Sequence, residues 1–318
     1  MLVRFWGTRG SIPVALTSAD IRRKVETALS LAIAKGVDTP DKVRAFIDND
    51  LDFSIAQTYG GQSPCVEIET GRDEFLVCDM GSGARAFAGR VMATQKSAPL
   101  VVNVLMSHVH WDHIMGFPFF TPAYIPGNRI RIYGGHEEME VAFRRQQAAP
   151  SFPVDFGTLA ADFEFIRLQP GRQYDIAGMQ VSIMLQRHSG DSYGYRFAAD
   201  GRTVIYTTDS EHALEDAKET SVYVNFFRDA DLVVFDAMYS LADAISVKAD
   251  WGHSSNIVGV ELCQLAGARQ LCLFHHEPIH GDAAIDRLLT ETRRYEEITR
   301  SGRPLLVTAA YDGMEIAL

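Results

Sequence analysis

The sequence contains few cysteines, and none of them belongs to a CxxC pair. The four lie far apart, each in an apolar stretch: Cys65, Cys78, Cys263 and Cys272. This spacing argues against a disulfide framework or a cysteine-based zinc site. We therefore expect all four thiols to be small core residues of a protein from a reducing compartment.

The sequence also shows no signal-peptide pattern, no stretch long enough to span a membrane and no excess of positive charge. No basic segment followed by an apolar run opens the chain, and no apolar run approaches the length of a membrane span, so we expect a cytoplasmic protein without membrane contact. The 30 basic and 41 acidic residues give a formal net charge of −11. Such a surface repels phosphate backbones, which makes a long nucleic acid a poor first choice of partner. A small anionic substrate remains compatible, because bound divalent cations reverse the local field.

The chain is 47% hydrophobic, and short strand-like runs alternate with helical stretches. This pattern predicts an α/β fold of stacked layers. Between the first two strands, residues 14–58 read as a helical insertion, either a surface elaboration or a lid. Its first helix is predicted over Ser18–Ala34, capped by Ser18 and ended by Gly36, and a second over Pro40–Ile47. Further helices are predicted at His136–Gln147, Ser255–Ala266 and Ala283–Glu297.

The strongest chemical signal follows the apolar strand Leu100–Met106. There, four side chains that bind metals lie within six residues: His108, His110, Asp112 and His113. His108 and His110 are two apart and point to the same side of an extended backbone. Imidazole nitrogens and a carboxylate suit Zn²⁺ or a similar ion, and burying them without a partner is costly. The run therefore predicts a metal site at a strand end.

Three later residues share this placement. His188, Asp209 and His275 each close an apolar strand, at the position where α/β folds gather their sites. One such residue alone could merely cap a loop. Together with the first cluster they predict a second metal ion, and the Asp209 carboxylate is suited to offer one oxygen to each ion.

These residues resemble the HxHxDH signature and later ligands of the metallo-β-lactamase superfamily. Within it, the runs 5–13, 59–61, 251–255 and 274–278 resemble the phosphodiesterase branch, which includes phosphoribosyl cyclic phosphodiesterases and tRNA 3′-end processing ribonucleases. The resemblance covers nearly the whole chain. It implies an αββα sandwich, with residues 1–318 forming one domain that carries the 14–58 insertion. The glycine- and proline-rich arm of the tRNA-processing enzymes is not evident.

The resemblance also assigns roles to single residues. It implies that His108, His110 and His188 hold one ion, that Asp112, His113 and His275 hold the other, and that Asp209 lies between them. Asp112 and His253 are the expected catalytic residues, with His253 donating a proton to the leaving oxygen or binding the phosphate. The alternative for His253 is a purely structural role as a residue at the start of the next helix.

Three further positions are left with two interpretations each. Asp79 either orients a ligand histidine or stabilises its own turn. His276 is a candidate supporting residue beside His275, or is simply exposed. Trp111 and the segment 117–120 form either an apolar wall beside the metals, able to stack on a base, or part of the core.

The favoured function is a binuclear hydrolase, with zinc as the first choice of metal and Mn²⁺ or Fe²⁺ as alternatives. Two ions would lower the pKa of a shared water, and the resulting hydroxide would cleave a small phosphodiester such as a cyclic nucleotide or a cyclic ribose phosphate. The alternatives are a nuclease acting on RNA or DNA ends, a lactone or thioester hydrolase, and a non-catalytic ligand sensor. A homodimer is compatible with the resemblance.

Overall fold

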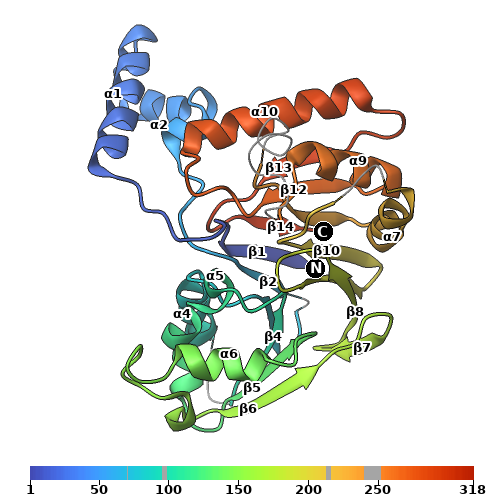
Figure 1. Ribbon diagram of the computed structural model, residues 1–318. Helices are drawn as coiled ribbons and strands as arrows, with labels where there is room; N and C mark the ends of the chain where they lie inside the picture. The colour runs from blue at the N-terminus through green and yellow to red at the C-terminus, as the bar shows by residue number, and fades with distance from the viewer. Residues whose placement is uncertain (70, 95–98, 213–215, 240–251) are drawn as a thin grey trace.

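Two β-sheets form the centre of the computed structural model, which describes residues 1–69, 71–94, 99–212, 216–239 and 252–318 (Figure 1). Trp251, part of one motif quoted above, lies outside these residues. The first sheet contains β1 (Leu2–Gly7), β2 (Cys65–Glu69), β3 (Phe75–Cys78), β4 (Val101–Met106), β5 (Arg129–Gly134), β6 (Asp162–Arg167) and β14 (Glu315–Ala317). The second contains β7 (Gln173–Ile176), β8 (Met179–Gln186), β9 (Ser192–Ala199), β10 (Arg202–Thr207), β11 (Leu232–Asp236), β12 (Gln270–Phe274) and β13 (Leu306–Ala309). Their strand orders are β14-β1-β2-β3-β4-β5-β6 and β13-β12-β11-β10-β9-β8-β7.

Helices cover the outer face of each sheet (Figure 1). On the first sheet lie α4 (Ala84–Thr94), α5 (Trp111–Ile114) and α6 (Met139–Gln146), with the short 3₁₀ turns η1 (Phe117–Phe119), η2 (Thr121–Tyr124) and η3 (Phe156–Thr158). On the second lie α7 (Ala217–Phe227), α9 (Asn256–Ala266) and α10 (Asp282–Thr299). The predicted sandwich of two sheets between helical layers is therefore confirmed. None of the described helices has the length and apolar character needed to cross a bilayer.

Three apolar clusters hold these layers together. One lies between the sheets and includes Phe5, Tyr195 and Phe274, all fully buried. A second joins α7, α9 and α10 to the second sheet, and a third joins α4 and α6 to the first. The four cysteines are buried and free, as expected for core residues. Burial raises the pKa of the Cys263 thiol, which keeps it protonated at neutral pH.

The insertion between β1 and β2 forms three helices, α1 (Ser18–Ala34), α2 (Pro40–Asn49) and α3 (Phe53–Ala56). The bounds of α1 match the prediction, but its predicted cap was wrong. Thr17, which is extended, accepts from Asp20 N in a reciprocal capping box, while Ser18 is already helical. Gly36 follows the helix in the left-handed region, as expected. The helix predicted from His136 begins only at Met139, because Glu138 lies outside helical geometry.

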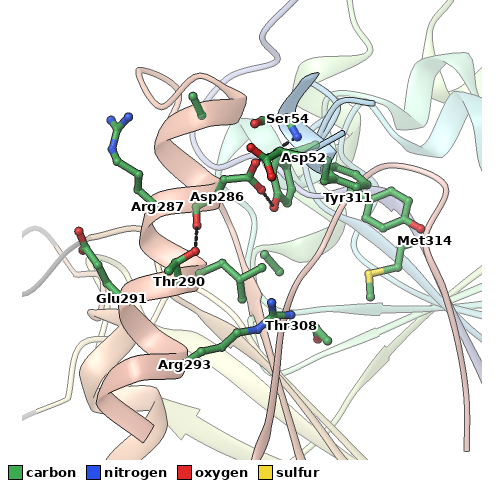
Figure 2. A pocket seen from close by; sticks show the side chains of 15 residues that line it. Asp52, Ser54, Asp286, Arg287, Thr290, Glu291, Arg293, Thr308, Tyr311 and Met314 are labelled. Carbon is green, nitrogen blue, oxygen red and sulfur yellow. Dashed lines mark hydrogen bonds between the residues drawn. The ribbon is translucent and has the colours of Figure 1, made fainter. Parts of the chain in front are cut away.

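The insertion contacts the body of the protein through polar groups and through the ring of Phe53, which packs against the second apolar cluster. Lys24 on α1 forms an ion pair with Asp282 of α10 at 2.5 Å, and it also donates to Gln57 O within the insertion at 2.7 Å. The Ser54 amide in α3 donates to Asp286 on α10 at 3.0 Å (Figure 2). None of the α1 residues is buried, so this helix projects from the body (Figure 1).

Candidate metal centre

The seven predicted ligands converge at one edge of the two sheets. His108 and His110 follow β4, and Asp112 and His113 lie in α5 directly after it. The others follow strands of the second sheet: His188 after β8, Asp209 after β10 and His275 after β12. Strands β10, β11 and β12 are mutually parallel, so their carboxyl ends meet on the same edge. The structure thus brings together side chains that are 167 residues apart in sequence at the extremes (His108 to His275).

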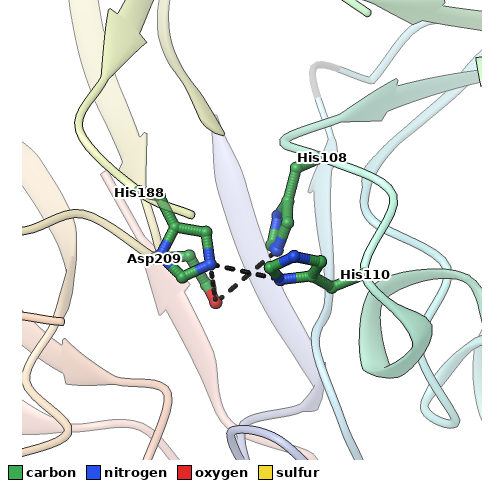
Figure 3. A group of neighbouring side chains, drawn as sticks. All are labelled: His108, His110, His188 and Asp209. Atoms are coloured by element: carbon green, nitrogen blue, oxygen red, sulfur yellow. Dashed lines mark hydrogen bonds and ion pairs between the residues drawn. The ribbon is translucent and has the colours of Figure 1, made fainter. Parts of the chain in front are cut away.

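The first ligand group consists of three histidines facing one carboxylate (Figure 3). His188 Nε2 lies 3.2 Å from His110 Nδ1 and 3.6 Å from Asp209 Oδ2. His108 Nε2 lies 3.7 Å from the same oxygen. One ligand atom from each residue falls within 4.8 Å of all the others, which leaves space for one cation between them.

The second group shares that carboxylate through its other oxygen. Asp209 Oδ1 lies 3.2 Å from His113 Nε2 and 3.2 Å from His275 Nε2. Asp112 Oδ2 completes the group at 3.3 Å and 3.5 Å from the same two nitrogens. The two oxygens of Asp209 therefore face different groups, which is the arrangement that a bridging carboxylate requires.

The hydrogen bonding of these atoms fits a pair of bound cations. Four buried ligand atoms have no hydrogen-bond partner within the described residues: His108 Nε2, Asp112 Oδ2, His113 Nε2 and His275 Nε2. Buried polar atoms are almost always satisfied, and leaving one unpaired costs about 1–3 kcal/mol. The donor set of imidazoles and carboxylates is the one that Zn²⁺ prefers. The residues present therefore fit two divalent ions.

The backbone is strained at three positions around this site. Asp79, Asp209 and His275 adopt φ values of 60°, 49° and 59°. Such left-handed geometry is unfavourable for residues other than glycine, costing about 1–3 kcal/mol each, and is found mainly at functional sites. Here it turns the side chain at each strand end toward the centre.

Asp79 lies fully buried behind the second group and accepts four hydrogen bonds. Ser107 donates its amide at 2.8 Å and its hydroxyl at 2.7 Å, and Tyr206 donates its hydroxyl at 2.7 Å. His113 Nδ1 lies 2.8 Å from Asp79 Oδ2, so Nε2 is left to face the cation position. Carboxylates commonly fix the tautomer and orientation of a ligand histidine in this way. These contacts favour the orienting role of Asp79 over a role confined to its turn.

His253 lies beside both ligand groups. Its ring centroid is 5.3 Å from that of His188 and 5.1 Å from that of His275. Asp236, at the end of β11, holds His253 Nδ1 at 2.8 Å. His253 also forms a third possible cluster with Asp209 and His275. It is not needed as a ligand, because each group already offers three side chains plus Asp209 and a catalytic metal site needs an open position.

The ionisation of the cluster reflects opposing effects of burial and charge. Burial lowers the pKa of His108 well below its ordinary value. Burial alone would also lower the pKa of His113, but the carboxylates of Asp112 and Asp209 outweigh it and raise that pKa. The histidines in turn hold the pKa of Asp209 well below its usual range, against the effect of burial. The carboxylate is therefore ionised at neutral pH, as a metal ligand must be, and a bound cation would displace the proton from His113.

Several contributors were not found by sequence reasoning. Tyr206 and Ser107 support Asp79, and Gly252 O accepts from His188 Nδ1 at 2.8 Å. Gly10 packs so closely on a ligand that a Cβ there would lie 2.6 Å from the His275 ring. The family-like run around Gly10 was the only sequence signal for this contact.

Two candidates remain, His276 and the expected apolar wall of Trp111 and residues 117–120, and they lie in different environments. His276 is buried, so the expectation that it is simply exposed was wrong. Its Nε2 donates to Ala310 O at 2.8 Å and its ring contacts Tyr59, and neither partner is a candidate ligand. Phe117 and Phe120 are fully buried core residues, whereas Trp111 and Phe119 are 64% and 58% exposed.

A separate hollow of about 750 Å³ lies between α3 and α10 (Figure 2). Its lining includes Asp52, Asp286, Arg287 and Arg293, and none of the seven ligands. Asp286 is already engaged by Tyr59 and Ser54, so this hollow offers no second metal cluster among the described residues.

Comparisons with known proteins extend this description. A family model described as Beta-lactamase superfamily domain matches residues 76–276, more than half of the chain. Ribonuclease Z from Thermoplasma acidophilum is 20% identical over 284 residues, which covers 74% of this chain and 86% of the relative.

Two solved structures share the fold over almost the full length. The metallo-beta-lactamase fold protein YhfI from Bacillus subtilis superposes with a TM-score of 0.64 at 18% identity, covering 99% of this chain and 98% of the other. A structure titled a new diphosphatase from the PhnP family gives a TM-score of 0.62 at 17% identity, covering 100% and 97%. At such identities these two structures support the fold alone.

Proposed function

Because this chain belongs to the beta-lactamase superfamily, we propose that it is a metal-dependent phosphodiesterase acting on a small phosphodiester. The family makes it a metal-dependent hydrolase of the metallo-β-lactamase fold. The number of ions, their identity and the bond that is cleaved are inferred from the chain's own residues.

We assign the two ligand groups to two divalent ions, with zinc as the first choice. His108, His110 and His188 would hold one ion, and Asp112, His113 and His275 would hold the other. Asp209 would offer one oxygen to each. When bound, such a pair polarises a phosphoryl oxygen and lowers the pKa of a shared water.

The observation that carries the choice of a phosphodiester is the His253–Asp236 pair beside both ligand groups. Asp236 fixes His253 Nδ1, so Nε2 is the ring nitrogen left for substrate. Burial lowers the pKa of His253, but the Asp236 carboxylate outweighs it and raises that pKa to about 9. A hydrogen-bond donor at this place suits an anionic phosphodiester better than a neutral lactone. From this position His253 can donate a hydrogen bond to the phosphate or a proton to the leaving oxygen.

A nuclease acting on RNA ends is the second candidate, and the similarity to ribonuclease Z favours it. The net charge of −11 weighs against it, since a long nucleic acid needs a basic surface. A small phosphodiester makes no such demand, which is why we place it first.

The test is a substrate panel with protein loaded with Zn²⁺ or Mn²⁺. We expect hydrolysis of bis(p-nitrophenyl) phosphate and of at least one cyclic nucleotide or cyclic ribose phosphate. Asp209→Asn, checked for folding by circular dichroism, is the control and should lose this activity. Turnover of a lactone, a thioester or an RNA 3′ end without turnover of small phosphodiesters would contradict the proposal. Tight binding of an unchanged nucleotide to fully loaded protein would instead indicate a sensor.

A further inference from the structure

An apolar pocket of about 730 Å³ lies beside the segment 108–113, which carries four of the candidate metal ligands. Trp111, Phe119 and Phe152 line it, together with Val141 on α6. The rings of Phe119 and Phe152 meet edge to face, with centroids 5.8 Å apart.

The pocket adjoins the first ligand group through the chain itself. Val109 and Trp111 line the pocket, whereas His108 and His110, which alternate with them, face the metal position. His110 and Trp111 are both exposed, and consecutive Cα atoms lie only about 3.8 Å apart. The pocket and the first ligand group therefore share one short segment of the chain, with Trp111 next to His110.

Three apolar side chains at this pocket are exposed and so contribute little to the buried core. Trp111, Phe119 and Val141 are 64%, 58% and 53% exposed, while the neighbouring Phe117 and Phe120 are fully buried in the core. Contiguous exposed apolar groups beside a polar site commonly mark a binding surface. Arg145, exposed on α6, also lines the pocket, and within the described residues no ion pair or hydrogen bond engages its guanidinium. Glu138 lines the pocket too, so an aromatic wall with a cation and a carboxylate at its edge suits a flat heterocycle that carries carbonyl and amino groups.

We propose that this pocket binds the base of a nucleotide substrate, with the base stacked on Trp111 and its phosphodiester at the metal centre. The proposal rests on the proposed function and narrows it, because a cyclic ribose phosphate has no base to fill the pocket. Stacking of a base on an aromatic side chain is worth roughly a 5- to 150-fold change in affinity.

Two substrates with the same leaving group isolate this contact. Thymidine 5′-(p-nitrophenyl phosphate) carries a base, and methyl p-nitrophenyl phosphate does not. We expect Trp111→Ala to lower kcat/KM for the nucleoside ester at least tenfold more than for the methyl ester, with unchanged metal content. Trp111→Phe should retain most of the wild-type ratio. Ile298→Ala, which removes a side chain that is 67% exposed on α10, is the matched control and should leave both values unchanged.

An equal loss on both esters, or an unchanged ratio, would overturn the base pocket while leaving the phosphodiesterase intact. If wild-type protein hydrolyses neither ester, calorimetry with AMP tests the pocket independently, while the substrate panel above decides the proposed function. Weaker AMP binding by Trp111→Ala than by wild type would then support the pocket. Equal binding, or no binding to wild type, would overturn it.

Discussion

Replacing Asp79 by Asn tests whether this buried carboxylate orients a metal ligand. Asp79 adopts a φ of 60°, and Asn is among the residues that tolerate the left-handed region best, so the backbone should be little affected. The amide also keeps the shape of the carboxylate. The substitution therefore changes chiefly the hydrogen bonding to Ser107, Tyr206 and His113.

The expected magnitude follows from the four donors that face Asp79. An amide has one acceptor oxygen, and its best position is that of Oδ2, which faces the Ser107 hydroxyl, Tyr206 and His113. Its NH₂ group then meets the Ser107 amide at 2.8 Å, donor against donor. One unsatisfied buried donor costs about 1–3 kcal/mol of folding stability. Losing the carboxylate behind His113 should weaken the ion of the second group by about 10- to 100-fold.

The assay is a zinc titration of the metal-free protein against a chromophoric chelator, with urea unfolding measured in parallel. The ion held with His113 should weaken most, because Asp79 contacts His113 directly but reaches His108 of the first group only through the Ser107 hydroxyl, 3.0 Å from His108 Nδ1. Tyr206→Phe, which removes one donor and keeps the carboxylate, is the control and should have a smaller effect. A folded Asp79→Asn protein that binds both ions with wild-type affinity would refute the orienting role and leave Asp79 as a turn residue.

Three further substitutions test the surroundings of the metal centre and the stability of the fold. Asp236→Asn removes the carboxylate that holds His253 at 2.8 Å, and we expect kcat on a phosphodiester to fall roughly 10²-fold with unchanged metal content. Gly10→Ala places a Cβ 2.6 Å from the His275 ring, and should lower stability by about 1–3 kcal/mol and weaken the second ion in a zinc titration. Burial lowers the pKa of His212 to about 3, so the unfolded chain takes up this proton first and stability is lost as the pH falls from about 6.5 toward 3. His212→Asn should reduce the slope of unfolding free energy against pH in that window by up to about 1.4 kcal/mol per pH unit.

Each of these changes has an outcome that would count against its reasoning. Loss of metal from Asp236→Asn would contradict a role confined to His253, because Asp236 Oδ1 also lies 3.9 Å from His275 Nδ1. Gly89→Ala, whose Cβ would meet nothing within 4 Å, is the control for Gly10→Ala, and equal behaviour of the two variants would remove the packing argument. An unchanged slope in His212→Asn would mean that His212 is not held neutral by burial.

The clustering of the seven candidate ligands could be predicted because they occupy recognisable places in the sequence. His188, Asp209 and His275 each end an apolar run, and strand ends converge in layered α/β folds. The residues that orient them could not be found in this way. Tyr206 lies 127 positions from Asp79, and the bond between their side chains depends on how the two sheets pack.

Some elements escaped prediction although their patterns were present. The buried residues of α4, Ala84, Phe87, Ala88 and Val91, recur at helical spacing. Strand β6 alternates polar and apolar residues over Asp162–Phe165, which is the pattern of a half-buried strand. The capping of α1 by Thr17 rather than Ser18 was a local ambiguity, because either hydroxyl could precede the first helical turn.

The most direct test of the binuclear phosphodiesterase is the activity of metal-free protein as zinc or manganese is added in known equivalents. With bis(p-nitrophenyl) phosphate as substrate, we expect activity to rise and reach its plateau at two ions per chain. A plateau at one ion, or no activity with two ions bound, would contradict it.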